Sequence, residues 1–451
     1  MTISAKYKES IKRAFKLSLP IVAGQLGLIL MGFFDTVQVG GLGASYMGAC
    51  GVANSVYFLF TLLGMGILYS VSPLVSEAFG EHHGWKSIAV MRSALKVSVI
   101  LSIVFTLLMI VVYRNFALFQ EKETTTLLAQ KFLHLLNFST PMLMLFTLGK
   151  QFMDGQGRTK VSMVVMIIGL VCNVFLNWVL IYGKLGCPAM GIEGAAIATG
   201  TSRTLMCLML CGYIIFDSKT RALIAEYKSA LVPAKSYVNQ ILRIGVPTGL
   251  MMFFEIAAFS AGNVMSGWIS ESSLASFQVA INLASITFMM VSGLAAAGTI
   301  MTGYAYGAKD KEELRVAGNT VYLLALCSQV IFAIFFLVFN HQLPRIYTSD
   351  AEVISTASSL LILAAVFQLS DGFQVVGSGI LRGMQDVKVP SILAFASYWL
   401  VMVPLSYTLA FRFNMGVTGI WIGFVIGLSA AAIFMYLRFR SKLNTIEFTD
   451  L

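Results

Sequence analysis

Long apolar runs separated by short polar breaks dominate the chain. Twelve of these runs are long enough to cross a lipid bilayer, because a helix of about 20 apolar residues spans its hydrocarbon core. The pattern therefore predicts an all-α integral membrane protein with twelve transmembrane helices. The expected spans are residues 14–37, 46–71, 88–112, 127–149, 161–182, 191–215, 244–268, 275–301, 316–340, 353–379, 389–411 and 416–437.

The composition supports this prediction. Of the 451 residues, 57% are hydrophobic and 12% are charged, and the mean hydropathy is +0.81. Soluble proteins carry about 25% charged residues, so a soluble fold is excluded. The first apolar run is too long for the core of a signal peptide and has no small-residue cleavage site after it. We therefore expect it to remain in the protein as a membrane helix.

Lys and Arg residues gather on one side of the predicted spans. Most of the 31 lie in the amino terminus, the even-numbered loops and the carboxyl terminus. Since basic loops stay in the cytoplasm, both termini are expected there, in the inner or plasma membrane of the cell. These loops account for the formal charge of +10, so nucleic-acid binding is not expected.

The two halves of the sequence repeat each other. Matching pairs lie at nearly one separation along the chain: Pro20 and Pro247, Gly66 and Gly293, Gly80 and Gly307, Gly155 and Gly383, and Lys160 and Lys388. A repeat of six spans keeps its direction, so the halves are parallel repeats, as in some secondary transporters. We expect two pseudo-symmetric six-helix lobes, residues 1–215 and 244–451, joined by a cytoplasmic linker at 216–243, around a central cavity.

Two acidic residues lie near the middle of predicted spans in the second half. Glu255 and Asp371 are each the only charged residue of their span. A carboxylate at this depth costs about 2.5–3.5 kcal/mol even on lenient scales. Either acid can be a structural residue hydrogen-bonded within its helix bundle. Two acids at similar depth favour a site in which a proton or cation relieves this cost.

Polar and flexible side chains surround these acids in the sequence. Gln368 and Gln374 are predicted to line the same cavity, with interhelical packing as the alternative. Four methionines are also candidates for the cavity lining, because flexible thioethers suit a site that accepts several ligand shapes: Met251, Met252, Met289 and Met290. Ordinary packing is the alternative for them too. A cavity of this kind opposite an acid indicates hydrophobic, cationic ligands.

A second candidate site lies in the first half. Asp35 is near the outer end of the first span, where it is either an acid facing water or part of a cation site. Asn173 and Asn177 share one helix face in the fifth span, and Thr199 lies in the sixth. Oxygens from these four residues would form a singly charged site of hard ligands suited to Na⁺, and the carboxylate can instead take a proton. Arg203, one turn after Thr199, is interpreted as a counter-ion or a donor to carbonyl groups.

Sequence motifs for catalysis or cofactor binding are absent. None of the six cysteines forms a CxxC pair. His82 and His83 are interpreted as solvated residues of a hydrophilic loop, and His134 and His341 lack partners at metal-ligand spacing. The chain also contains no Walker loop, HExxH or GxSxG motif. We therefore expect no cofactor apart from a coupling ion, and no enzymatic activity.

Six stretches together resemble the multidrug and toxic compound extrusion (MATE) family, especially its bacterial NorM-like branch. They are FFDTVQVGGLG at 33–43, SPLVSEAFGE at 72–81, MDGQGRTK at 153–160, GIEGAAIAT at 191–199, FEIAAF at 254–259 and DGFQVVGSGILRG at 371–383. The resemblance implies an antiporter that exports amphiphilic, often cationic drugs against Na⁺ or H⁺. It further implies a carboxy-lobe site at Glu255 and Asp371 and an amino-lobe cation site at Asp35. Several family branches have an aspartate where Asn177 stands, which puts the coupling ion in doubt.

The function predicted from these observations is secondary active multidrug efflux by alternating access, carried out by a monomer in contact with membrane lipids. A lipid-linked oligosaccharide flippase of the same broad superfamily is the first alternative. Flippases of that kind tend to line their cavity with basic residues, where this chain offers acids. A passive channel and a membrane enzyme are the alternatives from other classes.

Overall fold

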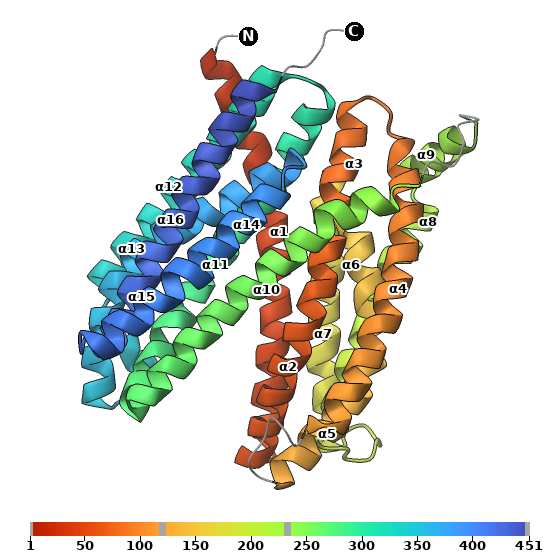
Figure 1. Ribbon diagram of the computed structural model, residues 1–451. Coiled ribbons are helices and arrows are strands. Elements are labelled where there is room, and N and C mark those ends of the chain that lie inside the picture. Colours follow the sequence, from red (N-terminus) through yellow and green to blue (C-terminus); the bar gives the residue numbers. More distant parts are fainter. Residues whose placement is uncertain (1–2, 117–122, 230–235, 447–451) are drawn as a thin grey trace. The chain divides into compact units, whose positions relative to one another are not determined.

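The computed structural model of the chain describes residues 3–116, 123–229 and 236–446, and these residues form helices and no strands (Figure 1). Within them, eleven helical segments are long and apolar enough to cross a membrane. A bent pair of helices brings the number of spans to twelve when it is counted as one. The prediction of an all-α membrane protein with twelve spans is confirmed.

The helices follow one another with short connections. In chain order they are α1 (Ile3–Gly40), α2 (Ala44–Leu68), α3 (Val71–Gly80), α4 (Lys86–Arg114), α5 (Glu123–Asn137), α6 (Thr140–Gly155), α7 (Thr159–Tyr182), α8 (Ile192–Phe216), α9 (Ser218–Ser229), α10 (Val238–Ile269), α11 (Glu271–Gly307), α12 (Lys311–Val338), η2 (Pro344–Ile346), α13 (Ala351–Gly383), α14 (Lys388–Phe395), η3 (Ala396–Met402), α15 (Val403–Tyr407), η4 (Thr408–Arg412) and α16 (Gly416–Thr445). Helices α2 and α3 together form one span, and α14 to η4 form another that contains two π-helical stretches, η3 and η4.

The bent span consists of α5 and α6, whose axes differ by 51°. Pro141 lies in the first turn of α6, where its missing N–H group is tolerated at the start of a new helix. Polar side chains tie the break to α4, since Asn137 Nδ2 donates to the Thr106 carbonyl of that helix at 3.1 Å. The Thr140 hydroxyl in turn donates to Asn137 Oδ1 at 3.2 Å.

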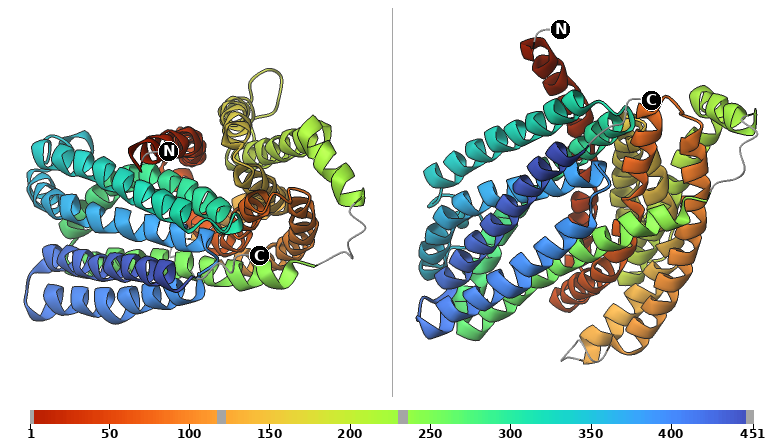
Figure 2. Two further views of the ribbon diagram at one scale, coloured as in Figure 1. Left: turned by 90° about the horizontal axis from the view of Figure 1, so that it is seen from above. Right: turned by 45° about the horizontal axis from the view of Figure 1, so that its top comes forward.

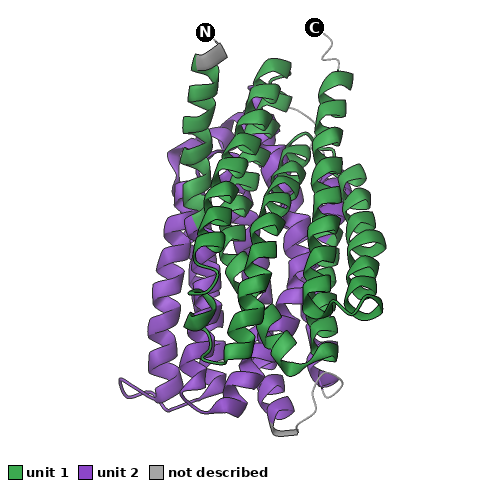
Figure 3. Ribbon diagram, turned by 90° about the vertical axis from the view of Figure 1, so that its left-hand side faces the viewer, with its two compact units in different colours: residues 1–22, 250–451 green, residues 23–249 purple. Residues whose placement is uncertain are grey.

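The chain divides into two compact units (Figure 3). Unit 1 consists of residues 1–22 and 250–451, and unit 2 consists of residues 23–249. These limits differ from the lobes expected at 1–215 and 244–451, because the long helices α1 and α10 each contribute residues to both units. The region expected as a linker, 216–243, contains α9 and the first turns of α10, so part of it is helical.

Unit 1 packs around α13, which contacts α11, α12 and α16 (Figure 2). Its core includes a cluster of aromatic rings at Phe277, Phe367, Trp421 and Phe424, whose centroids lie 5.3 to 6.5 Å apart. The start of α1 and the end of α16 lie at the same end of this unit (Figure 3). Both are tied to the start of α12, because Arg13 pairs with Glu313 at 3.0 Å and Lys311 donates to the Ile446 carbonyl at 3.2 Å.

Matching glycines of the two halves occupy matching places in the two units. Gly155 ends α6 and faces α3, and Gly383 ends α13 and faces α11. A Cβ atom at Gly155 would lie 2.7 Å from the Ser72 carbonyl oxygen, and one at Gly383 would lie 2.6 Å from the Thr299 carbonyl oxygen. Both positions therefore need glycine for close helix packing, as is common between membrane helices. This is a physical reason for the sequence repeat.

Apolar side chains also cover outer helix faces. Val99, Ile103 and Leu107 follow one face of α4 and are 47%, 56% and 58% exposed. Residues four apart share a helix face, so these side chains form a continuous apolar stripe. Such a stripe is stable against lipid rather than water.

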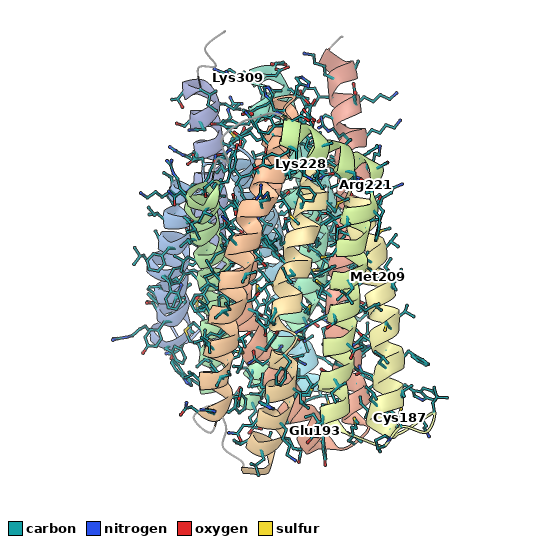
Figure 4. The ribbon with its side chains drawn as sticks, turned by 90° about the vertical axis from the view of Figure 1, so that its right-hand side faces the viewer. Cys187, Glu193, Met209, Arg221, Lys228 and Lys309 are labelled. Carbon is teal, nitrogen blue, oxygen red and sulfur yellow. The ribbon has the colours of Figure 1, made fainter. Side chains whose placement is uncertain are left out.

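The two ends of unit 2 differ in their side chains. In Figure 4, Cys187 and Glu193 lie at one end of its helices, and Arg221 and Lys228 of α9 lie at the opposite end. At the α9 end, Arg158 forms a two-bonded ion pair with Asp217, both bonds being 2.7 Å long. This ion pair is the main reason why the pKa of Asp217 lies well below its usual range.

Candidate functional site

A buried carboxylate in unit 2 collects polar side chains from two other helices. Asp35 of α1 is only 2% exposed. Its Oδ1 atom accepts hydrogen bonds from Asn177 Nδ2 at 2.5 Å and from Asn173 Nδ2 at 3.1 Å. Its Oδ2 atom accepts one from the Thr199 hydroxyl at 2.9 Å. The structure thus brings together the four residues singled out in the first half of the sequence, and Asp35 does not face water at a helix end.

Helices α7 and α8 position these partners. Asn173 and Asn177 are one turn apart on α7, so both amides point from the same face. The two helices pack closely, because a Cβ atom at Gly194 of α8 would lie 2.7 Å from the Leu180 carbonyl oxygen of α7. The end of α1 is fixed beside α7, since the Tyr182 hydroxyl donates to the Gln38 carbonyl at 2.6 Å.

The hydrogen bonds around Asp35 determine what the cluster can bind. Three neutral donors satisfy the charge of the carboxylate. The side-chain oxygens of Asn173 and Asn177 are buried and have no hydrogen-bond partner among the residues that the structure describes. Rotation of each amide by half a turn would direct these oxygens toward Asp35. Carboxylate, amide and hydroxyl oxygens would then surround a small cation, and such oxygens are the ligands that hard cations prefer.

A site of this composition differs from a transition-metal centre. Among the described residues, no group of three or more His, Cys, Asp or Glu side chains is placed to hold a metal ion. A cation at Asp35 would therefore be held by one carboxylate and by neutral oxygens. This donor set suits Na⁺ or a proton and is a poor match for zinc or copper, which prefer nitrogen and sulfur ligands.

A cavity of about 400 Å³ opens beside the cluster within unit 2. Asp35 and Thr199 lie in its wall, together with two basic residues, Lys150 and Arg203. Lys150, one residue beyond the expected span 127–149, lies within α6 and pairs with Asp154 at 2.7 Å. Within the described residues, Arg203 donates to the hydroxyl groups of Tyr57 and Ser139 and not to a backbone carbonyl, and its charge interacts with that of Asp35.

The two acids of the second half both lie in unit 1. Glu255 is on α10 and half-buried, and Asp371 is on α13 and 5% exposed. They lie near enough for their charges to interact with each other and with the buried hydroxyl of Tyr398. Tyr398 lies in the π-helical stretch η3, a type of distortion that is frequent at functional sites.

The candidate cavity-lining residues near these acids differ in how deeply they are buried. Gln368 and Gln374 lie one turn before and one turn after Asp371, and each is 1% exposed. In the described part of the chain, neither polar atom of Gln368 has a hydrogen-bond partner, and Oε1 of Gln374 has none either. Met251 packs in the core of unit 1. The other three candidate methionines are half-buried, and their role as a cavity lining stays a prediction: Met252, Met289 and Met290.

Sequence reasoning missed three residues of these sites. Gln329 of α12 is fully buried with both polar atoms unpartnered, and its side chain lies against Gly372, next to Asp371. A lone amide in an apolar span was a usable signal for it. Tyr398 and Tyr57 carried no such signal, because tyrosine is common in membrane helices near the bilayer surface.

Comparisons with known proteins agree with this architecture. The family model described as MatE matches residues 20–179 and 247–408, one segment in each half of the chain. The multidrug resistance protein MdtK of Yersinia pseudotuberculosis serotype O:1b (strain IP 31758) is 32% identical over 443 residues, covering 96% of each chain. The protein of the same name from Yersinia enterocolitica serotype O:8 / biotype 1B (strain NCTC 13174 / 8081) is 33% identical over the same length and coverage.

Solved structures share the fold. A crystal structure of MATE in the bent conformation superposes with a TM-score of 0.88 at 24% identity, covering 97% of this chain and 96% of the other. An outward-facing multidrug resistance MATE family transporter of the MOP superfamily gives a TM-score of 0.88 at 23% identity, covering 96% of each chain. The matched segments, the full-length relatives and the shared fold together establish that the chain belongs to the MatE family, as its resemblance predicted.

Proposed function

We propose that the chain is a secondary active exporter that exchanges amphiphilic, cationic organic compounds for Na⁺ or H⁺ by alternating access. The observation that carries this proposal is the Asp35 cluster. Among the described residues, only neutral donors bond to this buried carboxylate, and two amide oxygens beside it have no hydrogen-bond partner. Such a cluster is arranged to exchange its partners when a cation arrives. The family is one of transporters and not of enzymes, which agrees with the absence of catalytic motifs.

The relatives support the class of cargo. Those reported above are named multidrug resistance proteins, and the described cavity in unit 2 has mainly apolar walls that suit amphiphilic molecules. Glu255 and Asp371 supply two acidic groups in unit 1, where a cationic cargo or a coupling ion would bind. We infer that these two acids form the carboxy-terminal site and that Asp35, Asn173, Asn177 and Thr199 form the amino-terminal cation site.

Coupling requires that ion and cargo prefer different conformations. A cation entering from outside would neutralise the buried acids, weaken the hold on cationic cargo and favour return of the empty transporter. A difference in affinity of about 1.4 kcal/mol between the two conformations changes their ratio tenfold, so a few kcal/mol suffice. The burial of Asp35 supports a large effect of its charge, because burial raises the cost of leaving that charge uncompensated.

The membrane orientation follows the distribution of basic residues. We propose an inner-membrane protein with both termini in the cytoplasm, acting as a monomer. The start of α1 and the end of α16 lie at one end of unit 1, which supports placing both termini on one side. The gathering of Arg221 and Lys228 at one end of unit 2 supports assigning that end to the cytoplasm.

Transport in proteoliposomes tests the proposal. The purified chain is reconstituted with a fluorescent organic cation, and Na⁺ and pH gradients are imposed separately. We expect one gradient to drive uptake into vesicles in which the protein is inverted. Asp35→Asn should remove most of this dependence. Gradient-independent movement of the dye in the wild-type protein would refute coupled exchange and favour a passive channel.

A further inference from the structure

The cavity in unit 2 contains an arginine without an acidic partner in direct contact. Arg203 donates to the Tyr57 hydroxyl at 2.9 Å and to the Ser139 hydroxyl at 3.0 Å, and its guanidinium carbon lies 4.9 Å from the centre of the Tyr57 ring. In the part of the chain that the structure describes, no ion pair includes Arg203. Charges inside a membrane protein normally pair with opposite charges, so this guanidinium needs a specific reason.

The guanidinium edge of Arg203 that is formed by Nε and Nη2 has the geometry of an anion-binding group. Both of its hydrogen bonds come from Nη1. Within the described residues, Nε and Nη2 make no hydrogen bond. These two nitrogens form the planar fork that binds a carboxylate through two parallel bonds. The hydroxyl groups of Tyr57 and Ser139 therefore hold the side chain through Nη1, and Nε and Nη2 keep their donor capacity beside the cavity that Arg203 lines.

Lys150, the other basic residue in the cavity wall, already forms an ion pair within the protein. It pairs with Asp154 at 2.7 Å, and the two side chains are 13% and 5% exposed. An ion pair buried to this extent satisfies the charge of Lys150 within the protein. Arg203 is thus the better candidate for a positive group that contacts a bound molecule.

The rest of the cavity indicates the kind of molecule. Its volume is about 400 Å³, and its apolar lining includes Leu28, Ile29, Phe58, Met65, Phe146 and Met206. This lining suits an apolar body with one polar group. Asp35 lies in the same wall and its charge interacts with that of Arg203, which disfavours ligands with two negative charges such as phosphate monoesters.

We propose that the cavity of unit 2 binds amphiphilic carboxylates, and that Nε and Nη2 of Arg203 hold the carboxylate group. This inference rests on the proposed function, since it treats the cavity as part of the cargo path. It extends the cargo class from organic cations to molecules with one carboxylate. Arg203 is then a residue that determines specificity rather than a purely structural clamp between α2 and α8.

Equilibrium binding to the purified full chain in phosphatidylcholine nanodiscs tests this inference. The probes are dansyl-leucine and its methyl ester, which differ in the carboxylate charge, and empty nanodiscs supply the background. We expect Arg203→Gln to weaken binding of the acid roughly 10- to 100-fold, because charge-assisted hydrogen bonds are lost. Binding of the ester should change less than about twofold. Arg203→Lys keeps the charge but not the fork, so its affinity for the acid should be intermediate.

Arg92 offers a matched control. It donates to the Tyr227 hydroxyl at 3.2 Å and its guanidinium carbon lies 5.6 Å from the centre of that ring, yet it does not line the cavity. Arg92→Gln should leave the ratio of acid to ester affinity unchanged. If Arg203→Gln weakens binding of the acid and of the ester equally, Arg203 only holds α2 and α8 together. If binding of the acid is unchanged, Arg203 does not contact the carboxylate. Either result overturns the inference.

The binding assay separates this inference from the proposed function. It uses no ion gradient, so it reports on the site even if transport is not coupled to an ion. If the wild-type protein exports an organic cation when a gradient is imposed, and Arg203→Gln leaves the ratio of acid to ester affinity unchanged, the inference is refuted and the proposed function is not. If the dye moves without a gradient, and Arg203→Gln changes the ratio of acid to ester affinity, only the proposed exchange is refuted.

Discussion

Replacing Asn177 by Asp would place a second carboxylate against Asp35. In the structure, Asn177 Nδ2 donates to Asp35 Oδ1 at 2.5 Å, so the substitution turns the nearest donor into an acceptor of the same size. Both groups are buried, with Asp35 2% and Asn177 0% exposed. Solvent therefore screens little of the new repulsion.

The magnitude follows from Coulomb's law. Two carboxylates about 4 Å apart repel by about 4 kcal/mol at an effective dielectric constant of about 20. The second carboxylate attracts a bound cation by a similar amount, so the upper limit for tighter binding is roughly 1,000-fold. Movement of the two side chains away from each other reduces the effect, and the charge of Arg203 opposes it. We therefore expect Asn177→Asp to bind Na⁺ about 100-fold more tightly than the wild-type protein.

Binding of radioactive Na⁺ to the purified protein at pH 8, where protons compete least, measures this change. Asn177→Leu is the matched control, because it removes the amide without adding charge and should bind Na⁺ more weakly than wild type. Each variant must elute as a single peak in size-exclusion chromatography. A folded Asn177→Asp protein whose Na⁺ affinity equals or falls below that of wild type would refute the assignment of a cation to this cluster.

Three further predictions concern the acids of unit 1, the ion pair at the α9 end of unit 2, and the close helix packing at Gly155. Glu255→Gln or Asp371→Asn should abolish drug resistance in cells while the protein stays in the membrane at wild-type levels; undiminished resistance in both would remove these acids from the mechanism. Asp217→Asn should lower the unfolding temperature by a constant amount from pH 5 to 8. The depressed pKa of Asp217 means that its ionised form stabilises the fold, a contribution present above its ordinary pKa of 3.8 and lost as the pH falls through the folded pKa. If the difference in unfolding temperature between the wild-type protein and Asp217→Asn grows as the pH falls, this direction of the pH dependence is wrong. Gly155→Ala should cost about 1–3 kcal/mol of stability by overpacking against α3, whereas Gly212→Ala, whose Cβ atom would meet nothing within 4 Å, should be neutral or slightly stabilising in denaturant titrations. Equal stability of the two variants would argue against the close contact.

The sequence was sufficient to predict the spans because a membrane restricts the choice of structure. Inside lipid every backbone polar group must be bonded within the protein, so each long apolar run forms a helix. The bend between α5 and α6 was not predicted, although Pro141 is a signal for the start of a new helix. The compact units also cut through α1 and α10, because the division depends on side-chain packing along these helices and not on loop positions.

The candidate residues were recognisable in the sequence because polar groups are rare in apolar helices. Asp35, Asn173, Asn177 and Thr199 stood out for this reason, and the i, i+4 spacing already placed the two amides on one face. Their distances to Asp35, and the direction in which each amide points, depend on how α1, α7 and α8 pack. These relations join residues more than 130 positions apart and cannot be read from local sequence.

The sequence by itself determined the membrane class, the repeat and the identity of the buried acids, because lipid imposes a strong and local penalty on every polar residue. Tertiary structure alone decided which of those residues meet. It paired Lys150 with Asp154 and buried Asp35 among neutral donors. It also left Nε and Nη2 of Arg203 without a hydrogen-bond partner in the described part of the chain, beside a cavity. Helix packing fixes these contacts over distances that periodicity and composition do not encode.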